Sequence, residues 1–463
     1  MKKIYLYFLS TFLAIQINSC THKNSLERPN ILLINIDDMG WKDVGFMGSE
    51  YYHTPNIDEL SSKGMVFTNA YASAANCAPS RACLMTGKWT QRHGIYTVGS
   101  SARGETKDRR LIPVENTITL AKEHKIIPEV LHELGYITCH AGKWHLSESP
   151  LGYGFDLNIG GSDWGAPKTY HAPFKVNISS DSNQYLTDAI ADRAIEFIDT
   201  VSQPFFLYYS PYAVHTPIHP VDSLLYKYQN KPGWNGQNNI KYATMVENLD
   251  RNIGLLIDKL KAQKLYENTF IIFTSDNGGS FIATRQRPLR SGKGSYYEGG
   301  IRVPFFFIWS SRIQANTQSD LPITNLDVFP TILNVVGLAD QNEALDGNNL
   351  LPILEGKEKT MSRPLFWHFP IYLQAHKIKH NENRDSLFRT RPGSVVRYGD
   401  WKLHYYFEDK GMELYNLSDD IGERNNLIRA EHAIANEMLD YLELWWEKTN
   451  APIPQTKNPL YEE

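Results

Sequence analysis

Four apolar segments with β character, each followed by polar residues, constrain the fold of this chain more than any other feature. Helical patterns separate the segments, which span residues 31–36, 136–141, 205–209 and 270–275. Continuous apolar runs of this length are typical of strands that are buried on both faces of a parallel sheet. Because the carboxyl ends of parallel strands meet at one edge, the polar residues that follow the segments are expected to share one site.

Those polar residues predict a charged site that holds a cation. The strands run into Asp37, Asp38, Lys143, His145, His215, Asp276 and Asn277. Two adjacent carboxylates repel each other, so the first two residues favour a divalent cation as their companion. For that dipeptide taken alone, an acidic turn at a strand end is the simpler explanation. The recurrence of polar residues after all four strands is what favours a site.

A separate loop carries a candidate nucleophile, Cys77. In the run Cys-Ala-Pro-Ser-Arg, Pro79 favours a tight turn, and Ser80 is a candidate N-cap for a helix over residues 81–85. A cysteine at a helix N-terminus beside Arg81 lies in a positive field, which suits an anionic substrate. A lone cysteine in such a loop is more often buried and inert, so its role depends on the surrounding pattern.

The full pattern C-x-P-S-R-x-x-L-x-T-G, over residues 77–87, resembles the signature of the type I sulfatases. In that family the cysteine is oxidised after synthesis to formylglycine. The strings G-K-W-H-L at residues 142–146 and D-V-F-P-T-I-L at residues 327–333 resemble the same family. The resemblance implies an α/β fold like that of alkaline phosphatase, with a large mixed, mostly parallel sheet sandwiched by helices.

The resemblance also implies a role for each matching residue. The implied ligands of a calcium ion are the modified residue 77 and the side chains of Asp37, Asp38, Asp276 and Asn277. Arg81 and His145 are implied to hold and deprotonate the hydroxyls of the formylglycine hydrate, which attacks sulfur. Lys143 and Lys293 are implied to bind the sulfate oxygens. His215 is our candidate for the general acid on the leaving oxygen.

A sulfated glycan is the expected substrate. The string R-P-L-F-W-H-F-P, at residues 363–370, resembles bacterial carbohydrate sulfatases. Sulfated galactose or N-acetylgalactosamine is preferred by likeness alone. The candidate sugar-contact residues are Trp164, His171, Arg290, His368 and Arg391. The resemblance further implies a maturation partner, either the formylglycine-generating enzyme or the anaerobic sulfatase-maturing enzyme.

Other functions remain open at this stage. An arylsulfatase, or a phosphatase or phosphonate-ester hydrolase of the same superfamily, shares the fold and the metal site. A phosphatase is expected to carry an unmodified Ser or Thr nucleophile and a ligand set for two metals. A non-catalytic glycan-binding homologue is expected to have lost Cys77, Lys143 or His215, and all three are present.

The organisation of the chain changes near residue 364. Short β-leaning runs at residues 365–369, 394–397, 401–407 and 413–417 are separated by turns and followed by an amphipathic helix at 432–449. No long helix separates the last three runs, so an antiparallel meander is expected. We therefore predict a catalytic α/β domain over residues 28–364 and a smaller α+β subdomain over 365–463. Upstream, residues 116–134 are expected to form a helix that Pro128 interrupts or restarts.

The N-terminus predicts export. Lys2 and Lys3 precede an apolar run at residues 4–17, which is too short to span a bilayer, and Ile-Asn-Ser-Cys at 17–20 resembles a lipobox. We expect a lipoprotein signal peptide over residues 1–19, a lipid on Cys20 and a periplasmic or cell-surface location in a bacterium. An ordinary signal peptide or a retained anchor is the alternative.

The remaining cysteines and the net charge add little. An exported location permits a disulfide between Cys83 and Cys139, although two buried thiols are the preferred interpretation. The formal net charge of −4 gives no sign of a surface for nucleic acid, and no such partner is expected.

Overall fold

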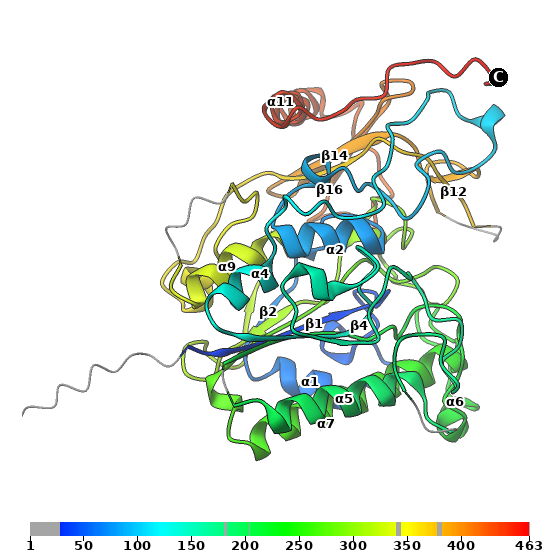
Figure 1. The fold of residues 1–463 in the computed structure, drawn as a ribbon. Coiled ribbons are helices and arrows are strands. Elements are labelled where there is room, and N and C mark those ends of the chain that lie inside the picture. Colours follow the sequence, from blue (N-terminus) through cyan, green and yellow to red (C-terminus); the bar gives the residue numbers. More distant parts are fainter. Residues whose placement is uncertain (1–27, 180–182, 203, 339–343, 377–381, 463) are drawn as a thin grey trace, which may run out of the picture.

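The computed structural model describes residues 28–179, 183–202, 204–338, 344–376 and 382–462. The expected signal peptide and Cys20 lie outside these residues. The described chain forms a large α/β part, with a smaller sheet and a long helix at its C-terminal end (Figure 1). Among the described residues, no helix combines the length and the apolar character that crossing a membrane requires.

The central sheet is large and mostly parallel, as the resemblance implied. Five neighbouring strands run in one direction, and β8 is the strand that runs against its neighbours. In spatial order the strands are β5 (Leu157–Ile159), β4 (Ile137–Gly142), β6 (Phe205–Ser210), β1 (Asn30–Ile36), β7 (Thr269–Ser275), β8 (Phe306–Ile308), β2 (Met65–Phe67) and β9 (Thr317–Ser319).

Strand β1 lies at the centre of this sheet and is buried on both faces. Ile31 and Leu33 belong to one hydrophobic core, whereas Leu32, Ile34 and Ile36 belong to the core on the opposite face. Successive side chains of a strand point to opposite faces, so an unbroken apolar run is what two cores require. The prediction of a central buried strand is confirmed.

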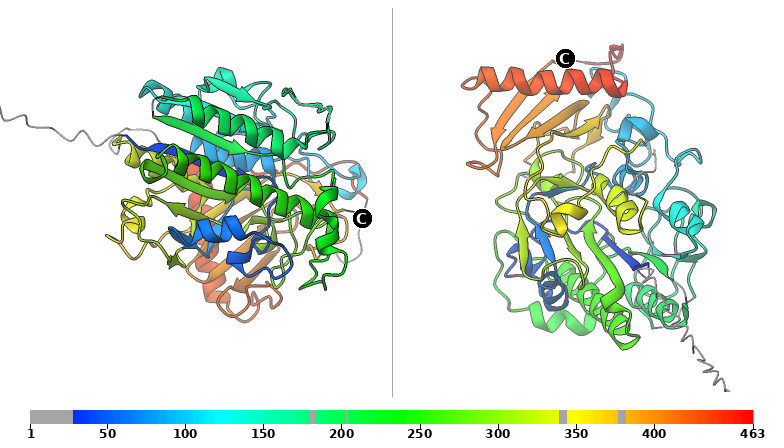
Figure 2. Two further views of the ribbon diagram at one scale, coloured as in Figure 1. Left: turned by 90° about the horizontal axis from the view of Figure 1, so that it is seen from below. Right: turned by 90° about the vertical axis from the view of Figure 1, so that its left-hand side faces the viewer.

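Helices cover both faces of the sheet, as expected from the apolar stripes between the strands. Figure 1 and the view from below in Figure 2 show helices on both sides of the sheet. One face carries α1 (Pro55–Ser61), α5 (Leu186–Thr200) and α7 (Ile240–Ala262), and the other carries α2 (Cys77–Thr86), α4 (Ile127–Glu133) and α9 (Val328–Val335). Shorter elements are β3 (Ala70–Tyr71), β10 (Ile323–Thr324), α3 (Thr90–His93), α6 (Leu225–Tyr228), α8 (Glu298–Ile301) and α10 (Leu351–Leu354).

The helix expected over residues 116–134 is wrong in its first half. Only α4 is helical, and Pro128 lies in its first turn, where a missing N–H costs nothing. The side chain of Asn116 instead accepts hydrogen bonds from the backbone of Tyr96 and Thr97, which holds its segment as a loop. Tertiary contacts of this kind override helix propensity.

The C-terminal part forms an antiparallel sheet under a closing helix, as predicted. The order is β11 (Leu365–Phe369), β14 (Gly393–Tyr398), β15 (Trp401–Tyr406) and β16 (Met412–Asn416), and α11 (His432–Thr449) lies across one face (Figure 2). Met438, Leu442 and Trp445 of α11 pack against Leu403 and Leu414 of the sheet. A two-stranded ribbon, β12 (Leu373–Gln374) with β13 (Phe388–Thr390), lies beside it. The domain boundary after residue 364 stays a prediction.

Candidate active site

The four strand ends meet at one edge of the sheet, because β4, β6, β1 and β7 are direct neighbours. The connections between them are short backbone hydrogen bonds. The N–H of Lys143 donates to Ser210 at 2.6 Å, the N–H of Val214 to Asp37 at 2.9 Å, and the N–H of Asp276 to Ile36 at 3.0 Å. Residues more than 200 positions apart in sequence are therefore held in one small volume.

Cys77 faces this edge from the start of helix α2. The helix begins at Cys77 itself with Asn76 as its N-cap, so the expectation that Ser80 caps a helix from residue 81 is wrong. Pro79 lies in the first turn of α2. Backbone N–H groups there have no acceptor within the helix, so the missing N–H of proline costs no hydrogen bond. The thiol is 1% exposed, and burial raises its pKa to about 12 despite nearby Lys143 and Lys293. The unmodified thiol is therefore protonated at neutral pH and is a weak nucleophile.

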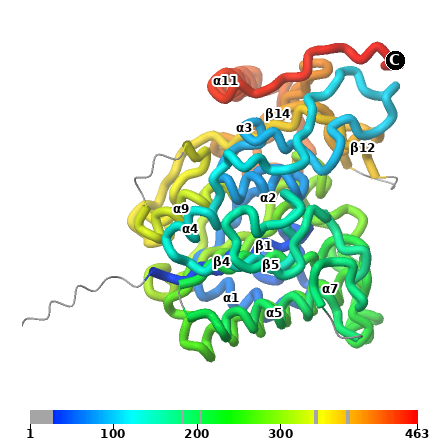
Figure 3. Tube along the Cα trace, viewed as in Figure 1, coloured from blue at the N-terminus to red at the C-terminus, as the bar shows by residue number. Residues whose placement is uncertain are grey.

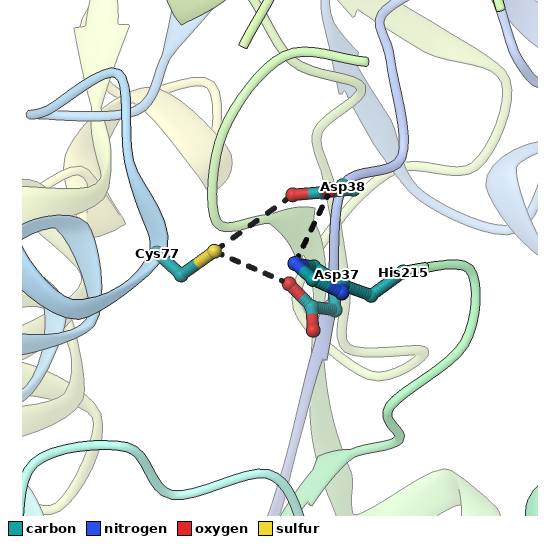
Figure 4. Close-up of side chains that lie close together, drawn as sticks. All are labelled: Asp37, Asp38, Cys77 and His215. Atoms are coloured by element: carbon teal, nitrogen blue, oxygen red, sulfur yellow. Dashed lines mark hydrogen bonds and ion pairs between the residues drawn. The ribbon is translucent and has the colours of Figure 1, made fainter. Parts of the chain in front are cut away.

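Two carboxylates and one imidazole surround the sulfur of Cys77 (Figure 4). The Sγ atom lies 3.5 Å from Asp37 Oδ1 and 3.8 Å from Asp38 Oδ1. His215 approaches from the side opposite Cys77, and its Nε2 lies 3.7 Å from Asp38 Oδ2. One potential ligand atom from each of these four residues lies within 4.8 Å of the others, which is the spacing of a metal site.

Three buried cations balance the carboxylates. The Nζ of Lys143 lies 2.7 Å from Asp37, and the Nζ of Lys293 lies 2.6 Å from Asp38. The guanidinium of Arg81 pairs with Asp276 at 2.8 Å. Burial alone raises the pKa of the Asp38 carboxyl, but Lys293 and neighbouring cations more than offset it, so this pKa lies well below its usual range. Asp38 is thus charged, whereas burial raises the pKa of the Asp37 carboxyl in spite of Lys143. Positive charge collects beside the nucleophile.

Arg81 also fixes the geometry of its neighbours. Its Nη1 donates to the backbone carbonyl of Lys143 at 2.8 Å and to the Ser210 hydroxyl at 2.5 Å. Ser210 in turn donates to Asn35. Ser210 was missed in the sequence, although it ends an apolar strand and the same reasoning that found Asp37 points to it.

The donor set fits a hard divalent cation. The amide of Asn277 donates from Nδ2 to Asp38 at 2.9 Å and to the Gly278 carbonyl, while its buried Oδ1 has no partner among the described residues. A buried acceptor without a partner is costly and points to an absent ligand. Together with the carboxylates of Asp37, Asp38 and Asp276, this oxygen forms the kind of set that calcium prefers. The structure itself contains no ion.

The two histidines occupy different positions in the site. His145 has a φ of 65°, and Gly165 packs so closely on its ring that a Cβ there would lie 2.6 Å away. Its buried Nδ1 has no partner among the described residues, and burial together with Lys143 holds its pKa well below the usual range. His215 directs Nδ1 to the Thr216 carbonyl at 2.7 Å, which leaves Nε2 facing the site. Burial and Lys293 lower the pKa of His215.

The candidate sugar-contact residues fall into two groups. Trp164 is 37% exposed, and His171 is exposed and stacks on His219, so both are accessible. Arg290 and Arg391 are partly buried and already engaged, the first with the ring of Tyr297 and the second with Asp385 and Glu408.

His368 departs from the prediction most clearly. Only 1% of its surface is exposed, and both ring nitrogens are bonded, Nδ1 to Ser394 and Nε2 to the Pro452 carbonyl. It therefore belongs to the packing between β11 and α11 and not to a sugar surface. Cys83 and Cys139 are both buried free thiols, which agrees with the preferred interpretation.

A nucleophile at a helix N-terminus, with paired carboxylates and ammonium groups beside it, suits the hydrolysis of an anionic ester. On this sheet and at this edge, it defines a hydrolase of the alkaline-phosphatase-like superfamily. Comparison with known families narrows the class to one family of hydrolases. The family described as Sulfatase matches residues 29–338. The chain belongs to the sulfatase family, and it is a sulfuric ester hydrolase.

The C-terminal part and the full-length relatives agree with this assignment. The family described as N-sulphoglucosamine sulphohydrolase, C-terminal, matches residues 292–444. A sulfatase of Formosa agariphila is 31% identical over 94% of this chain and 92% of its own length. The N-acetylgalactosamine-6-sulfatase of Canis lupus familiaris is 32% identical over 73% of this chain and 68% of its own length. The solved structure of Ps i-CgsB in complex with k-i-k-neocarrahexaose is 30% identical with a TM-score of 0.74, and the match covers 93% of this chain and 96% of that one.

Proposed function

We propose that this sulfatase removes sulfate from a sulfated glycan, with formylglycine made from Cys77 and with a bound calcium ion. The observation that carries the proposal is the position of Cys77 Sγ, 3.5 Å from Asp37 and 3.0 Å from Lys293. A reacting group at residue 77 thus lies beside both the candidate cation ligands and an ammonium group. That arrangement suits an ester with a negatively charged reacting group.

Formylglycine at residue 77, in its hydrated form, would supply a hydroxyl nucleophile where the buried thiol is weak. Asp37, Asp38, Asp276 and Asn277 would hold the calcium ion, which would supply positive charge to the site. A maturation enzyme that oxidises Cys77 is then a required partner.

The chain's own residues perform the remaining tasks. Lys143 and Lys293 approach residue 77 from different elements and bind sulfate oxygens, so charge that develops in the transition state is met by ammonium groups already in place. Nδ1 of His145 has no hydrogen-bond partner in the described part of the chain, which suits it to accept a proton from a hydroxyl at residue 77. His215, whose Nε2 faces the site, delivers a proton to the departing sugar oxygen. Its lowered pKa rises again when an anionic ester binds nearby.

Two observations support a glycan as the substrate: the substrates named for similar proteins, and the accessible aromatic side chain of Trp164 near the site loops. One relative is an N-acetylgalactosamine-6-sulfatase, and one similar structure holds a carrahexaose. A sulfated galactose or N-acetylgalactosamine is accordingly the substrate we propose. Trp164, which is partly exposed and has Lys168 4.9 Å from its ring, offers a face on which a sugar can stack.

The cellular location is also proposed from the sequence. Lys2, Lys3, the apolar run and the string ending at Cys20 support an exported lipoprotein of a bacterial envelope. Metabolic labelling with a fatty acid tests this: the label is expected on the natural chain and absent from a Cys20→Ser variant. Label retained by that variant would contradict the lipid site.

Mass spectrometry combined with sulfate release tests the central proposal. Protein made in a host with the maturation enzyme is expected to carry formylglycine at residue 77 and to release sulfate from a panel of sulfated mono- and disaccharides. Cys77→Ala is expected to lose nearly all turnover, and Cys77→Ser to form at best a trapped ester. An active preparation that carries only the thiol would contradict the mechanism.

A further inference from the structure

A cluster of basic side chains, two of them guanidinium groups, lies next to the nucleophile and is not used by the proposed chemistry. The cluster consists of Arg103, His376 and Arg389, and Lys293 joins it to the site. A partly open pocket is lined by Lys293, His376 and Arg389 together with Phe281, Ser291, Gly292 and Asn383. Since the Nζ of Lys293 lies 2.6 Å from Asp38, one wall of this pocket is also a wall of the candidate active site.

The side chain of Arg389 is held rigidly in place. Its Nε donates to the carbonyl of Gln374 at 3.1 Å, and its Nη1 donates to the carbonyl of Lys293, also at 3.1 Å. Gly294 has a φ of 87°, and a Cβ at that position would lie 2.9 Å from Nη1 of Arg389. The close approach of Arg389 to the Lys293 loop therefore needs glycine at residue 294.

Arg103 reaches the same region from a different part of the chain. The N–H of Arg103 donates to the Tyr372 carbonyl, and the N–H of Tyr372 donates to Ser101. Figure 3 shows this cyan segment passing beside β12. The ribbon that carries Gln374 and Arg389 is thereby linked to the loop that carries Arg103.

The carboxylate of Asp38 attracts Arg389 and His376, but it is already paired with Lys293. Within the described part of the chain, neither Arg103 nor Arg389 forms an ion pair with a carboxylate, and the buried Nε2 of His376 has no hydrogen-bond partner. Burial and the neighbouring Arg103 lower the pKa of Arg389 to about 10, and burial with Arg389 lowers the pKa of His376 to about 4. Burying like charges close together costs free energy unless a bound anion neutralises them.

We propose that Arg103, His376 and Arg389 bind a second anionic group of the substrate, a carboxylate or another sulfate ester, next to the sulfate that is hydrolysed. This inference rests on the proposed function, because it assigns the region beside the reacting sulfate to the same glycan. The substrate class then narrows to glycans with two acidic groups close together. Two guanidinium groups suit either a planar carboxylate or a sulfate.

Direct binding to the inactive Cys77→Ala protein tests this assignment. The probes are a monosulfated galactose, the same sugar with two sulfates, and a monosulfated galacturonic acid. At least one dianionic probe is expected to bind about tenfold or more tightly than the monosulfate, as lost charge-assisted hydrogen bonds are worth that much. Preference for the disulfate alone identifies a sulfate, and preference for the uronic acid alone identifies a carboxylate.

Variants of Arg103 provide the discriminating step. In the Cys77→Ala background, Arg103→Gln is expected to reduce the preference for the dianion about tenfold, and Arg103→Lys to retain most of it. Arg193→Gln, which removes a positive charge from the distant surface of α5, serves as the matched control. Equal binding of all three probes by the parent, or an unchanged preference in Arg103→Gln, would overturn the proposal.

Failure of the inference can be told from failure of the proposed function. Active enzyme is assayed separately for sulfate release from each of the three probes. Sulfate release without any preference for dianions refutes only the role of the cluster. A preference for dianions without sulfate release from any probe refutes the proposed reaction and leaves the anion site standing.

Discussion

The ammonium of Lys293 lies 3.0 Å from the sulfur of Cys77, although the two residues are 216 positions apart. Lys293 also contacts Asp38. Burial alone would lower the pKa of Lys293, but Asp38 and other anionic groups nearby raise it above its usual range, so Lys293 stays charged. This contact places a permanent positive charge beside the residue that reacts.

Removal of that charge is expected to slow the reaction with every substrate. Lys293→Ala should lower kcat/KM by roughly 100- to 1,000-fold, the loss typical of a group that stabilises transition-state charge. Sulfate-oxygen contacts do not depend on the leaving group, so a sulfated sugar and a nitrophenyl sulfate should suffer alike. Parallel kinetics on the two substrates check this, and a loss confined to the sugar would contradict it. Lys143→Ala is expected to behave in the same way.

His215→Ala is expected to separate the two substrates. A sugar alkoxide is a poor leaving group and needs a proton as the S–O bond breaks, and general-acid help is typically worth about 100- to 10,000-fold. A nitrophenolate leaves without protonation. Turnover of the sulfated sugar should therefore fall far more than turnover of nitrophenyl sulfate. Equal losses would mean that His215 binds sulfate or the cation and that another group donates the proton.

Removal of the cation is expected to abolish activity, and calcium should restore it better than zinc. The unpartnered Oδ1 of Asn277 is the observation behind this prediction. Asn277→Leu should weaken calcium binding on the order of tenfold or more, measured by titration calorimetry after chelation. Asn239→Leu, which removes only the N-cap of α7, is the control and should leave calcium affinity unchanged. Full activity in excess chelator would argue against a metal.

The C-terminal sheet is tied to the α/β part by a buried ion network, which predicts a large effect on stability. The Nζ of Lys402, on β15, lies 2.8 Å from Glu298 and 3.0 Å from Glu423, and all three side chains are fully buried. Lys402→Met removes the cation that Glu298 and Glu423 share and leaves Glu298 with Arg302 and Glu423 with His404, which should cost about 3–5 kcal/mol in the free energy of unfolding. Lys107→Met breaks an exposed pair with Glu462 and should cost less than about 1 kcal/mol. Denaturant titration measures both, and similar losses would contradict the role of the network.

His368 predicts loss of stability in mild acid. Its Nε2 donates to the Pro452 carbonyl, while the Ser394 hydroxyl accepts from Trp446 and so donates to Nδ1, which fixes the neutral ring. Burial lowers the pKa of His368 to about 4, from an ordinary value near 6.5. The unfolded chain therefore binds a proton on His368 more tightly than the folded chain does. The stability contributed by the neutral, buried ring is complete above pH 6.5 and is lost as the pH falls towards 4.

The slope of unfolding free energy against pH tests this prediction. His368→Gln should flatten the slope between pH 6.5 and 4. Phe366→Leu, which weakens the stacking on Trp445 without removing a titrating group, should lower stability equally at every pH. An unchanged slope in His368→Gln would show that other groups control acid unfolding.

Much of the candidate site could be predicted from sequence because its residues follow recognisable strands. The apolar run ahead of Asp37 is long enough to need two hydrophobic faces, and only the middle of a parallel sheet provides them. The same reasoning reached Lys143, His215 and Asp276, and the alternation and turns after residue 393 predicted the meander. The prediction overlooked Ser210, although it ends the strand at residues 205–210. It did not reach Arg103 or Arg389, since nothing in their neighbouring residues distinguishes them from ordinary polar positions.

The sequence by itself determined which segments are buried, and with them which polar residues end a strand. Only the tertiary structure decided the strand order that brings β4, β6, β1 and β7 together, the contact of Lys293 with Cys77, and the burial of His368 against α11. The physical reason is that hydrophobic periodicity reports a residue's immediate neighbours, whereas these contacts join segments far apart in the chain. The loop at residues 116–126 is a second example. Asn116 accepts hydrogen bonds from the backbone of Tyr96 and Thr97, and helix propensity, which depends on the local sequence, contains no information about those partners.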